Sequence, residues 1–395
     1  MRILIVSNTP FLPTTAGNRA RIAQMVTHLR AEGAEIAVLL LTDADRATWD
    51  EAGMRAQVAH CEIVAPSFSA RLTDRVERIR TGAAPDPATP YGIDDWCPPW
   101  FRRRVAAFAR AWQPTVVIAE YVFLSMCLDD LRQVVPHALR IIDTHDVMHR
   151  RQSVYDAAGL TPRWFHTTST EERRGLLRAD TVLAIHADEA AILRQLVPER
   201  RVLTVPHGHP VALPRWEMAA PDRAVFIASH NALNREGWER FVGGVWPLVR
   251  AAAPRLRIDV HGSIATELHG VAEGIALHGP AVSLSEIYAR ARVVVNPIPS
   301  ATGLQIKTVE ALCHARPMVS TPAGAGGLSE DAGVLVAHSA AEFAAALVRL
   351  VDDDVAWRRV AGAAHDYALT HFAPAVAFAE LLRHLRTHDA ATPTP

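Results

Sequence analysis

The stretch 300–328, SATGLQIKTVEALCHARPMVSTPAGAGGL, constrains the fold most, because helix, strand and glycine patterns follow one another in it directly after a buried strand. A strand, a helix and a further strand in this order are typical of a parallel sheet in an α/β protein. Its parts are a strand at 293–295 ending at Asn296-Pro297, Gly303, a helix over 304–314, a strand at 318–321 and the glycine-rich loop 323–327.

Two charged residues lie early in the predicted helix, Lys307 and Glu310. The N-terminus of a helix offers free backbone N–H groups and the positive end of the helix dipole, which suit a phosphate. Lys307 would add a full positive charge. Glu310 is three residues further on, so it shares a face with Lys307 and can accept hydrogen bonds from a sugar hydroxyl. This pattern predicts a nucleotide-sugar site; the alternative is an ordinary surface ion pair.

The length of 395 residues exceeds one ordinary hydrophobic core and predicts two α/β domains. Strand and helix patterns alternate on both sides of a cluster of prolines, histidines and a glycine at 206–214, where we place the boundary. The domains are then 1–212 and 213–373. A final helix over 375–387 carries apolar residues at helical spacing.

The first βαβ unit consists of a strand at 3–6, a helix over 19–32 and a strand at 35–41. Its long first loop contains a single glycine, Gly17, where the dinucleotide fingerprint G-x-G-x-x-G needs three. A nicotinamide dehydrogenase therefore loses most of its support. Gly17 either lets the backbone approach a ligand or serves a simple turn.

Polar residues follow a strand at 139–142, where Asp143, Thr144, His145 and Asp146 stand in a row. Ligand sites of open parallel sheets gather at the carboxyl ends of strands. His145, flanked by carboxylates, can act as an acid or orient a hydroxyl. The alternative is that the aspartates only close a turn. A metal site is disfavoured here, because ligands packed within one tetrapeptide rarely converge on one ion.

Composition limits the partners. The 41 Lys+Arg residues balance 42 Asp+Glu residues, so no nucleic-acid partner is expected. The four cysteines form no CxxC pair, which argues against zinc and disulfides and favours a cytoplasmic protein. No run of about 18 apolar residues predicts a membrane span. The arginines within 71–80 and the segment 100–104 indicate weak peripheral contact with the inner face of a membrane, contact with an acidic acceptor, or a solvated helix face.

Taken together, these stretches resemble a GT-B glycosyltransferase of the retaining, group 1 type (the GT4 family). The resemblance covers nearly the whole chain and implies two Rossmann-like, doubly wound parallel-sheet domains facing a central cleft, with the helix 375–387 packed back on the first domain. The stretches that carry it are the loop with Gly17, the segment 142–147, the segment from 226–229 through Asn234 to 245–247, and 303–312 with Pro317 and the loop 324–328.

The resemblance also implies roles. Glu310 matches the second glutamate of the family's E-x7-E motif, which holds the nucleotide ribose. Gly303 and Leu304 match the turn whose amides meet the donor phosphates, with Lys307 as a counter-charge. His145 matches a histidine near the transferred sugar. The whole expected set is His145, Asp143 and Asp146 for catalysis, and Gly17, Asn18, Asn231, Asn234, Arg235, Thr302, Gly303, Leu304, Lys307 and Glu310 for the donor.

This chain departs from the family pattern at two places. Thr302 stands where the first glutamate of E-x7-E is expected, which leaves the sugar and the mechanism open. Many members clamp the diphosphate with an Arg and a Lys after the first strand of the second domain. Here Asn231, Asn234 and Arg235 are the polar residues in that region, and Arg235 is the candidate for the clamp.

The expected reaction is transfer of a sugar from a nucleoside-diphosphate sugar to a hydroxyl of a glycan, a lipid-linked saccharide or a small molecule, as in polysaccharide biosynthesis. Retention of configuration follows from the resemblance alone. No cofactor or metal is expected beyond the donor substrate. The alternatives are a nucleotide-sugar epimerase on the same scaffold and a catalytically silent nucleotide-binding homologue.

Overall fold

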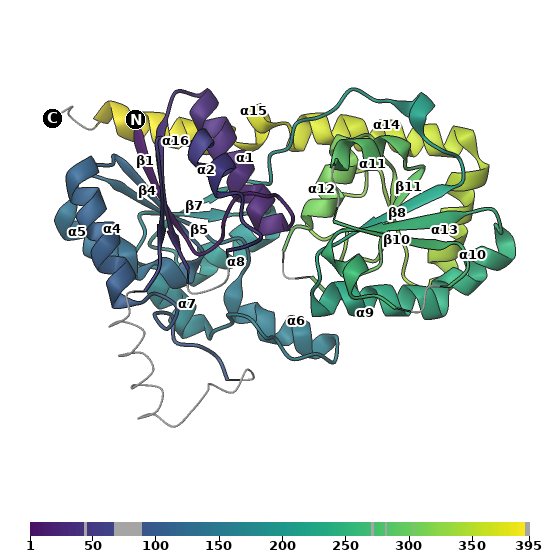
Figure 1. Cartoon of the computed structure of the whole chain (residues 1–395), viewed down its shortest axis with the longest axis horizontal. Coiled ribbons are helices and arrows are strands. Elements are labelled where there is room, and N and C mark those ends of the chain that lie inside the picture. Colours follow the sequence, from purple (N-terminus) through teal and green to yellow (C-terminus); the bar gives the residue numbers. More distant parts are fainter. Residues whose placement is uncertain (43–45, 67–88, 270–271, 281–282, 302, 392–395) are drawn as a thin grey trace.

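A computed structural model describes residues 1–42, 46–66, 89–269, 272–280, 283–301 and 303–391. It has two lobes, each built on a parallel sheet with helices on both faces (Figure 1). The arginine-rich segment 71–80 lies outside the described residues, and so does Thr302. The fold class expected from the sequence, two doubly wound α/β domains, is confirmed.

The first sheet has the strand order β3-β2-β1-β4-β5-β6-β7, with every pairing parallel. Its central strands are buried along nearly their whole length, as a sheet covered on both faces requires. The strands are β1 Arg2–Ser7, β2 Glu35–Leu41, β3 His60–Val64, β4 Val116–Glu120, β5 Leu139–Asp143, β6 Thr181–Ala184 and β7 Arg201–Thr204. The helices are α1 Gly17–Ala31, α2 Glu51–Gln57, α4 Pro99–Trp112, α5 Met126–Val134, α6 Arg151–Ala157, α7 Ser169–Leu176 and α8 Ala187–Leu196.

The second sheet has the order β10-β9-β8-β11-β12-β13 and is also parallel. Its strands are β8 Arg223–Ile227, β9 Arg257–His261, β10 Ile275–Gly279, β11 Val293–Asn296, β12 Met318–Ser320 and β13 Val334–Val336. Its helices are α9 Ala232–Arg240, α10 Trp246–Ala252, α11 Leu284–Arg290, α12 Ile306–Cys313, α13 Ala340–Asp352 and α14 Asp354–His371.

The helix after β8 differs from the single helix that the sequence predicts over 237–253. It begins at Ala232, because the side chain of Asn231 caps it by accepting the N–H of Asn234 at 2.8 Å. A π-helical turn, Phe241–Val245, then separates α9 from α10. Pro247 in the first turn of α10 lacks the N–H that a continuous α-helix would need there, which accounts for the wider turn.

The chain returns to the first domain at its end. After α14, the helices α15 Pro374–Ala377 and α16 Ala379–Ala391 run alongside the first lobe (Figure 1). Phe378, Leu381 and Leu385 are buried in the same core as residues of β1 and α1. The ring of Phe378 also fills the space beside Gly208, where a Cβ would lie 2.5 Å from a ring atom. The C-terminal segment is therefore part of the first domain's core.

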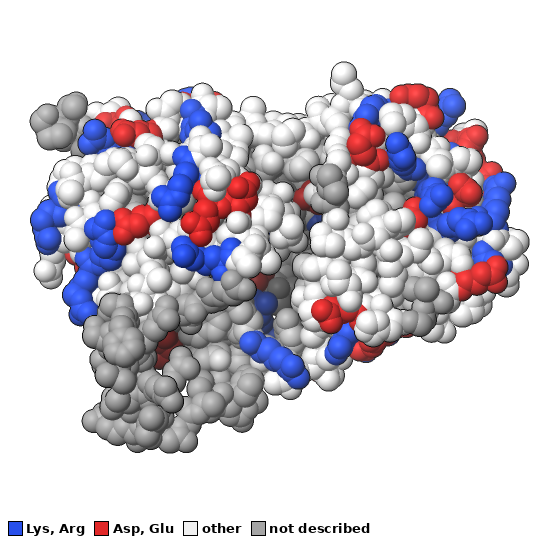
Figure 2. Space-filling model, in the orientation of Figure 1, with Lys and Arg blue, Asp and Glu red and all other residues white. Residues whose placement is uncertain are grey.

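The basic segment 100–104 lies on α4. Arg102 pairs with Asp130 at 2.8 Å and Arg104 pairs with Glu62, while Phe101 is buried. Figure 2 shows Lys and Arg interspersed with Asp and Glu on the visible face. These contacts favour the solvated helix face over a membrane-binding one. Across the part of the chain that the structure describes, no helix is long and apolar enough to cross a membrane.

Candidate functional site

A cavity of about 900 Å³ lies between the two domains, and the surface is hollowed where they meet (Figure 2). Its walls come from the loops that follow β1, β4 and β5 on one side, and from those that follow β8, β9 and β11 on the other. Carboxyl ends of parallel strands from both sheets therefore face one space. The volume is at the upper end of the range for small-molecule sites.

The first-domain wall contains a group of buried charges behind β4 and β5. Arg21 on α1 donates from Nε and Nη2 to both carboxylate oxygens of Asp143, at 2.8 and 2.7 Å. His145 Nε2 lies 2.6 Å from Glu120 Oε2 and 3.9 Å from Asp143 Oδ2. All four side chains are at most a few per cent exposed. The wall thus holds two interlocked acid–base pairs.

The protonation of these groups follows from their surroundings. Burial would raise the pKa of Asp143, but the Arg21 guanidinium outweighs it and holds that pKa below its ordinary value. Burial raises the pKa of Glu120, although the hydrogen bond with His145 opposes the shift. Glu120, Asp143 and His145 lie close enough together to hold a metal ion, but both oxygens of Asp143 are taken by Arg21, which disfavours a cation there.

His145 is held in a strained backbone conformation. Its φ of 58° lies in the left-handed region, as does the φ of 68° at Tyr121. The two rings stack with centroids 4.1 Å apart. Strain of this kind persists where surrounding contacts fix it, and it clusters at functional sites. Because Glu120 occupies Nε2, a proton exchange with a ligand in the cavity would use Nδ1.

Loops of the two domains touch beside this wall. A Cβ on Gly303 would lie 2.8 Å from Asp146 Oδ1 and 3.2 Å from the carbonyl oxygen of His145. A Cβ on Gly17, at the start of α1, would lie 2.9 Å from the side chain of Ile306, at the start of α12. Both glycines therefore allow close approach between the domains, which explains them without requiring a ligand.

The second-domain wall is formed by α12 and its neighbours. Lys307 Nζ donates to Asn234 Oδ1 at 2.6 Å and lies 5.2 Å from the ring centre of Phe226. The hydroxyl of Tyr288 donates to Glu310 Oε2 at 3.2 Å. Among the residues that the structure describes, no ion pair within 4.0 Å involves Lys307 or Glu310. The alternative interpretation, an ordinary surface ion pair between Lys307 and Glu310, is therefore wrong.

Lys307 and Glu310 are each only partly ionised at neutral pH, because both pKa values are shifted to about 7. Burial lowers the pKa of Lys307 to about 7, with Glu310 opposing the shift. Burial raises the pKa of Glu310 to about 7, although Tyr288 and Lys307 pull it down. Groups shifted in this way, in a cleft, are typical of functional sites. An anion beside Lys307 would restore its charge.

The glycine loop is tied to α12 by Asn296 at the end of β11. Its Nδ2 donates to Thr308 Oγ1 at 3.1 Å and to the carbonyl oxygen of Gly324 at 3.3 Å. Thr308 Oγ1 donates to the same carbonyl at 3.0 Å. A Cβ on Gly324 would lie 2.3 Å from Ser320 Oγ. These hydrogen bonds hold β11, α12 and the glycine loop together, and they thereby fix the positions of Lys307 and Glu310 on α12.

The structure brings most of the expected site residues to the cavity. Asp146 reaches it and pairs with Arg151 at 3.1 Å. Arg235 does not reach it: the side chain is exposed on α9, 3.8 Å from Glu239. Asp143 lies behind His145, and Gly303 packs against the first domain, so neither lines the cavity. The expected residues that do line it are Gly17, Asn18, His145, Asp146, Asn231, Asn234, Leu304, Lys307 and Glu310.

Sequence reasoning missed the roles of Arg21, Glu120 and Tyr288. Arg21 lines the cavity although its side chain is only 1% exposed, and its Nη1 has no hydrogen-bond partner in the structure. A charge on the buried face of a helix is a signal that could have been found, since Arg21 precedes Ile22 and Met25 in the apolar pattern of α1. Tyr288 gives no such signal, because an aromatic residue in a helix is ordinary core material.

Two sequence models match consecutive parts of the chain. A "Glycosyl transferase 4-like domain" matches residues 16–208, and "Glycosyl transferases group 1" matches residues 221–353. No curated protein matches the sequence significantly.

Solved structures share the fold over nearly the whole length. Sucrose-phosphate synthase from Thermosynechococcus elongatus has a TM-score of 0.70 at 15% identity, covering 99% of this chain and 100% of that one. HepE from Anabaena, in complex with UDP and glucose, has a TM-score of 0.68 at 13% identity, covering 98% and 100%. The pneumococcal O-GlcNAc transferase GtfA, in complex with UDP and GlcNAc, has a TM-score of 0.68 at 11% identity, covering 98% and 99%. At these identities the likeness shows the fold alone, which is GT-B.

Proposed function

The chain belongs to the group 1 glycosyltransferases, and from the cavity we propose that it takes its sugar from a nucleoside diphosphate and passes it to an acceptor hydroxyl. One observation carries this proposal. Lys307 and Glu310 stand on one face of α12, line the cavity and have only neutral hydrogen-bond partners. Among the described residues Lys307 has no anionic partner, and Glu310 has one carboxylate oxygen that Tyr288 does not use, so together they suit a diphosphate joined to a ribose.

In this arrangement the ribose hydroxyls donate to Glu310, whose second oxygen is not used by Tyr288. The diphosphate lies by Lys307, Asn234 and the free amides at the start of α12. Asn231 caps α9 from the same wall. UDP is the first nucleotide to try, because the HepE and GtfA structures contain it.

The transferred sugar then points toward the first-domain wall. His145, Asp146 and Arg21 line that side, and Nη1 of Arg21 is buried without a hydrogen-bond partner in the part of the chain that the structure describes. Glu120 holds the His145 ring, so a hydroxyl of the sugar or of the acceptor meets a fixed imidazole. The acceptor enters from the same side and is a glycan, a lipid-linked saccharide or a small molecule.

The chemical step separates charge. As the glycosidic bond breaks, negative charge grows on the leaving diphosphate and positive charge on the sugar ring. Preorganised donors contribute most where charge develops, so Lys307 and the amides of α12 stabilise the leaving group. In this proposal they do so without a metal ion or another cofactor, and the acceptor attacks with retention, as the family resemblance implies.

The decisive experiment is a thermal-shift screen of the whole chain with UDP, GDP, ADP and TDP. A nucleotide that binds only the native state at 100 times its Kd should stabilise it by about 2.7 kcal/mol. Glu310→Gln should weaken the response, and Glu342→Gln, on the exposed start of α13, is the matched control.

If none of the four nucleotides raises Tm, the proposal fails. An isomerised sugar without an acceptor would indicate the epimerase instead, and binding without turnover would indicate a silent homologue.

A further inference from the structure

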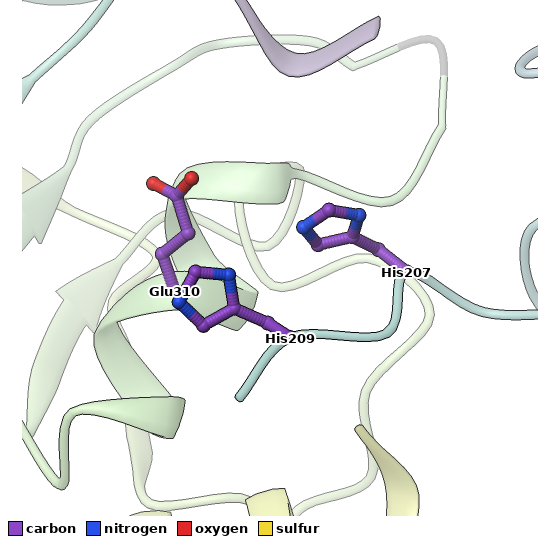
Figure 3. A group of neighbouring side chains, drawn as sticks. All are labelled: His207, His209 and Glu310. Atoms are coloured by element: carbon purple, nitrogen blue, oxygen red, sulfur yellow. The ribbon is translucent and has the colours of Figure 1, made fainter. Parts of the chain in front are cut away.

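A second cluster lies where the linker between the domains passes α12. His207 and His209 follow β7 on this linker, and their rings project toward the helix that carries Glu310 (Figure 3). One ligand atom from each of these three side chains lies within 4.8 Å of the other two. Glu310 is the member that also lines the cavity.

His207 has no hydrogen-bond partner. Its side chain is completely buried, and neither ring nitrogen has a partner in the structure. Leaving a buried polar group unpaired destabilises a protein by about 1–3 kcal/mol, and such a group in a native fold calls for an explanation such as an ion or a water. The two histidines are separated by one residue, Gly208, and a packing role alone would not need both beside a carboxylate.

We propose that His207, His209 and Glu310 bind a divalent first-row transition ion, with Zn²⁺ as the type. Imidazole nitrogens suit zinc, nickel and copper, whereas magnesium and calcium prefer oxygen ligands. Two histidines and a glutamate, with one coordination position left for water, form a ligand set that zinc uses. The ion would give one ring nitrogen of His207 the partner that it lacks.

The geometry permits such an ion. Zinc bonds of about 2.0–2.2 Å keep the donor atoms of a site within roughly 4 Å of one another. The donor atoms here lie within 4.8 Å of one another, so side-chain rotations that move the donor atoms by less than about 1 Å would bring them to that spacing. Arg21, His145 and Lys307 face the cluster, and the ring of His314 lies 5.7 Å from that of His209. Arg21 is paired with Asp143 at 2.7 Å, His145 is bonded to Glu120, and Lys307 donates to Asn234. Glu310 supplies the negative charge.

The ion would act on donor binding. Tyr288 already donates to Glu310 Oε2, so a metal ion on the other oxygen would take the position at which the ribose hydroxyls donate. The ion and the donor therefore compete for this oxygen; this second step rests on the proposed function. The ion would also fasten the linker to α12, because its two histidines and its glutamate come from different segments. The site is therefore an inhibitory one, separate from the chemistry of transfer.

The first test is calorimetric titration of Zn²⁺ into the chelator-treated, tag-free full chain. One ion per chain should bind, and His209→Ala should weaken the affinity at least tenfold, the scale on which zinc sites lose affinity when their supporting residues change. His338→Ala, which removes an exposed histidine on the second domain, should bind as the parent does. Co²⁺ should give a visible absorption band that His209→Ala loses.

Two results would overturn the site: no Zn²⁺ uptake by the parent chain, or equal uptake by His209→Ala. His207→Gln gives a second reading once its circular dichroism shows that this buried position tolerates the change. If either of the two overturning results is found, water and not a metal ion is the partner of the His207 ring.

The second test measures Zn²⁺ affinity with and without the nucleotide found by thermal shift, holding free Zn²⁺ with a metal buffer because diphosphates chelate it. Saturating nucleotide should lower the affinity at least tenfold, and equal affinities would overturn the exclusion. If no nucleotide binds even without metal, the proposed function fails, while the Zn²⁺ titration still decides the metal site.

Discussion

The two walls of the cavity treat their charges in opposite ways. On the first-domain wall, Arg21 and Asp143 form a two-pronged pair, and His145 is bonded to Glu120. On the second-domain wall, Lys307 and Glu310 have only neutral partners. On the first wall, each charged side chain therefore has an ionisable partner without any ligand. On the second wall, Lys307 and Glu310 have no ionic partner within hydrogen-bond distance among the residues that the structure describes.

This difference separates positioning from binding. Charges that are paired internally hold a side chain at a fixed place, which favours a chemical step. Charges that are buried without a counter-charge destabilise the empty protein, and an ionic ligand relieves that penalty. We therefore expect changes on the first wall to lower turnover and changes on the second wall to lower nucleotide affinity.

The largest effect should come from His145→Ala. Removing a positioned acid–base group typically lowers kcat by about 10²–10⁴-fold, while nucleotide affinity should stay within about twofold. Steady-state kinetics and calorimetry on the same preparation measure the two quantities. His149→Ala is the control, because that ring bonds to Glu172 outside the cavity lining. An equal loss of affinity and turnover would contradict the division between the walls.

Lys307→Met should mainly weaken binding. A hydrogen bond to a charged group contributes about 1.5–3 kcal/mol, so the nucleoside diphosphate should bind roughly 10–100-fold less tightly. Without ligand, the same variant should melt at a higher temperature than the parent, because a buried unpaired charge is gone. Calorimetry and thermal unfolding check the two signs. A variant that keeps full affinity would remove Lys307 from the donor site.

Glu120→Gln tests whether Glu120 acts through His145. The amide keeps the shape but removes the buried negative charge, so we expect kcat to fall by about tenfold with KM little changed, and the pH profile of kcat to shift. A change confined to Tm, with kinetics intact, would reduce Glu120 to a structural residue. Glu172→Gln, a buried acid bonded to His149 and away from the cavity, is the matched control.

A smaller effect is expected from pH: nucleotide affinity should fall as the pH rises. The pKa of Lys307 is lowered to about 7 in the empty protein, first by burial, and a diphosphate should raise it again. Protonated Lys307 binds, so affinity should be flat below pH 7 on account of this group and should fall roughly fivefold between pH 7 and pH 8. Titrations from pH 6 to 9 measure the slope. Lys307→Met should abolish this fall; if the slope survives the substitution, another group causes it.

The smallest effect should be that of Arg235→Ala. Its side chain lies on the exposed face of α9 beside Glu239 and does not line the cavity. We expect nucleotide affinity within about twofold of the parent, because exposed ion pairs contribute little. Asn234→Ala, one residue earlier, should be clearly weaker in binding. A large loss at Arg235 would mean that α9 turns toward the ligand.

Much of the fold follows from local patterns. Strand β2 begins and ends where its apolar run and the residues that bound it predict. The sequence does not predict the edge strand β13, although its residues Val334–Val336 are all apolar, because a run of three is shorter than the four to eight residues that indicate a strand. The break between α9 and α10 depends on one proline inside an otherwise helical pattern.

The site divides in the same way. Lys307, Glu310 and His145 could be predicted, because each stands at a strand end or a helix start that the chain itself marks. Arg235 was placed wrongly with respect to the cavity: successive helix residues differ by about 100° around the axis, so Asn234 faces inward and Arg235 outward. Arg21, Tyr288 and His207 reach the site only through packing between distant segments, which no local pattern reports.

The C-terminal helices have a consequence for the order in which the molecule can be completed. Phe378, Leu381, Leu382 and Leu385 lie in one core with residues of β1 and β2, which are synthesised more than 300 residues earlier. The first half of the chain therefore cannot close this core while the second half is still on the ribosome. β1 and β2 therefore complete their core only after the whole second domain has been synthesised.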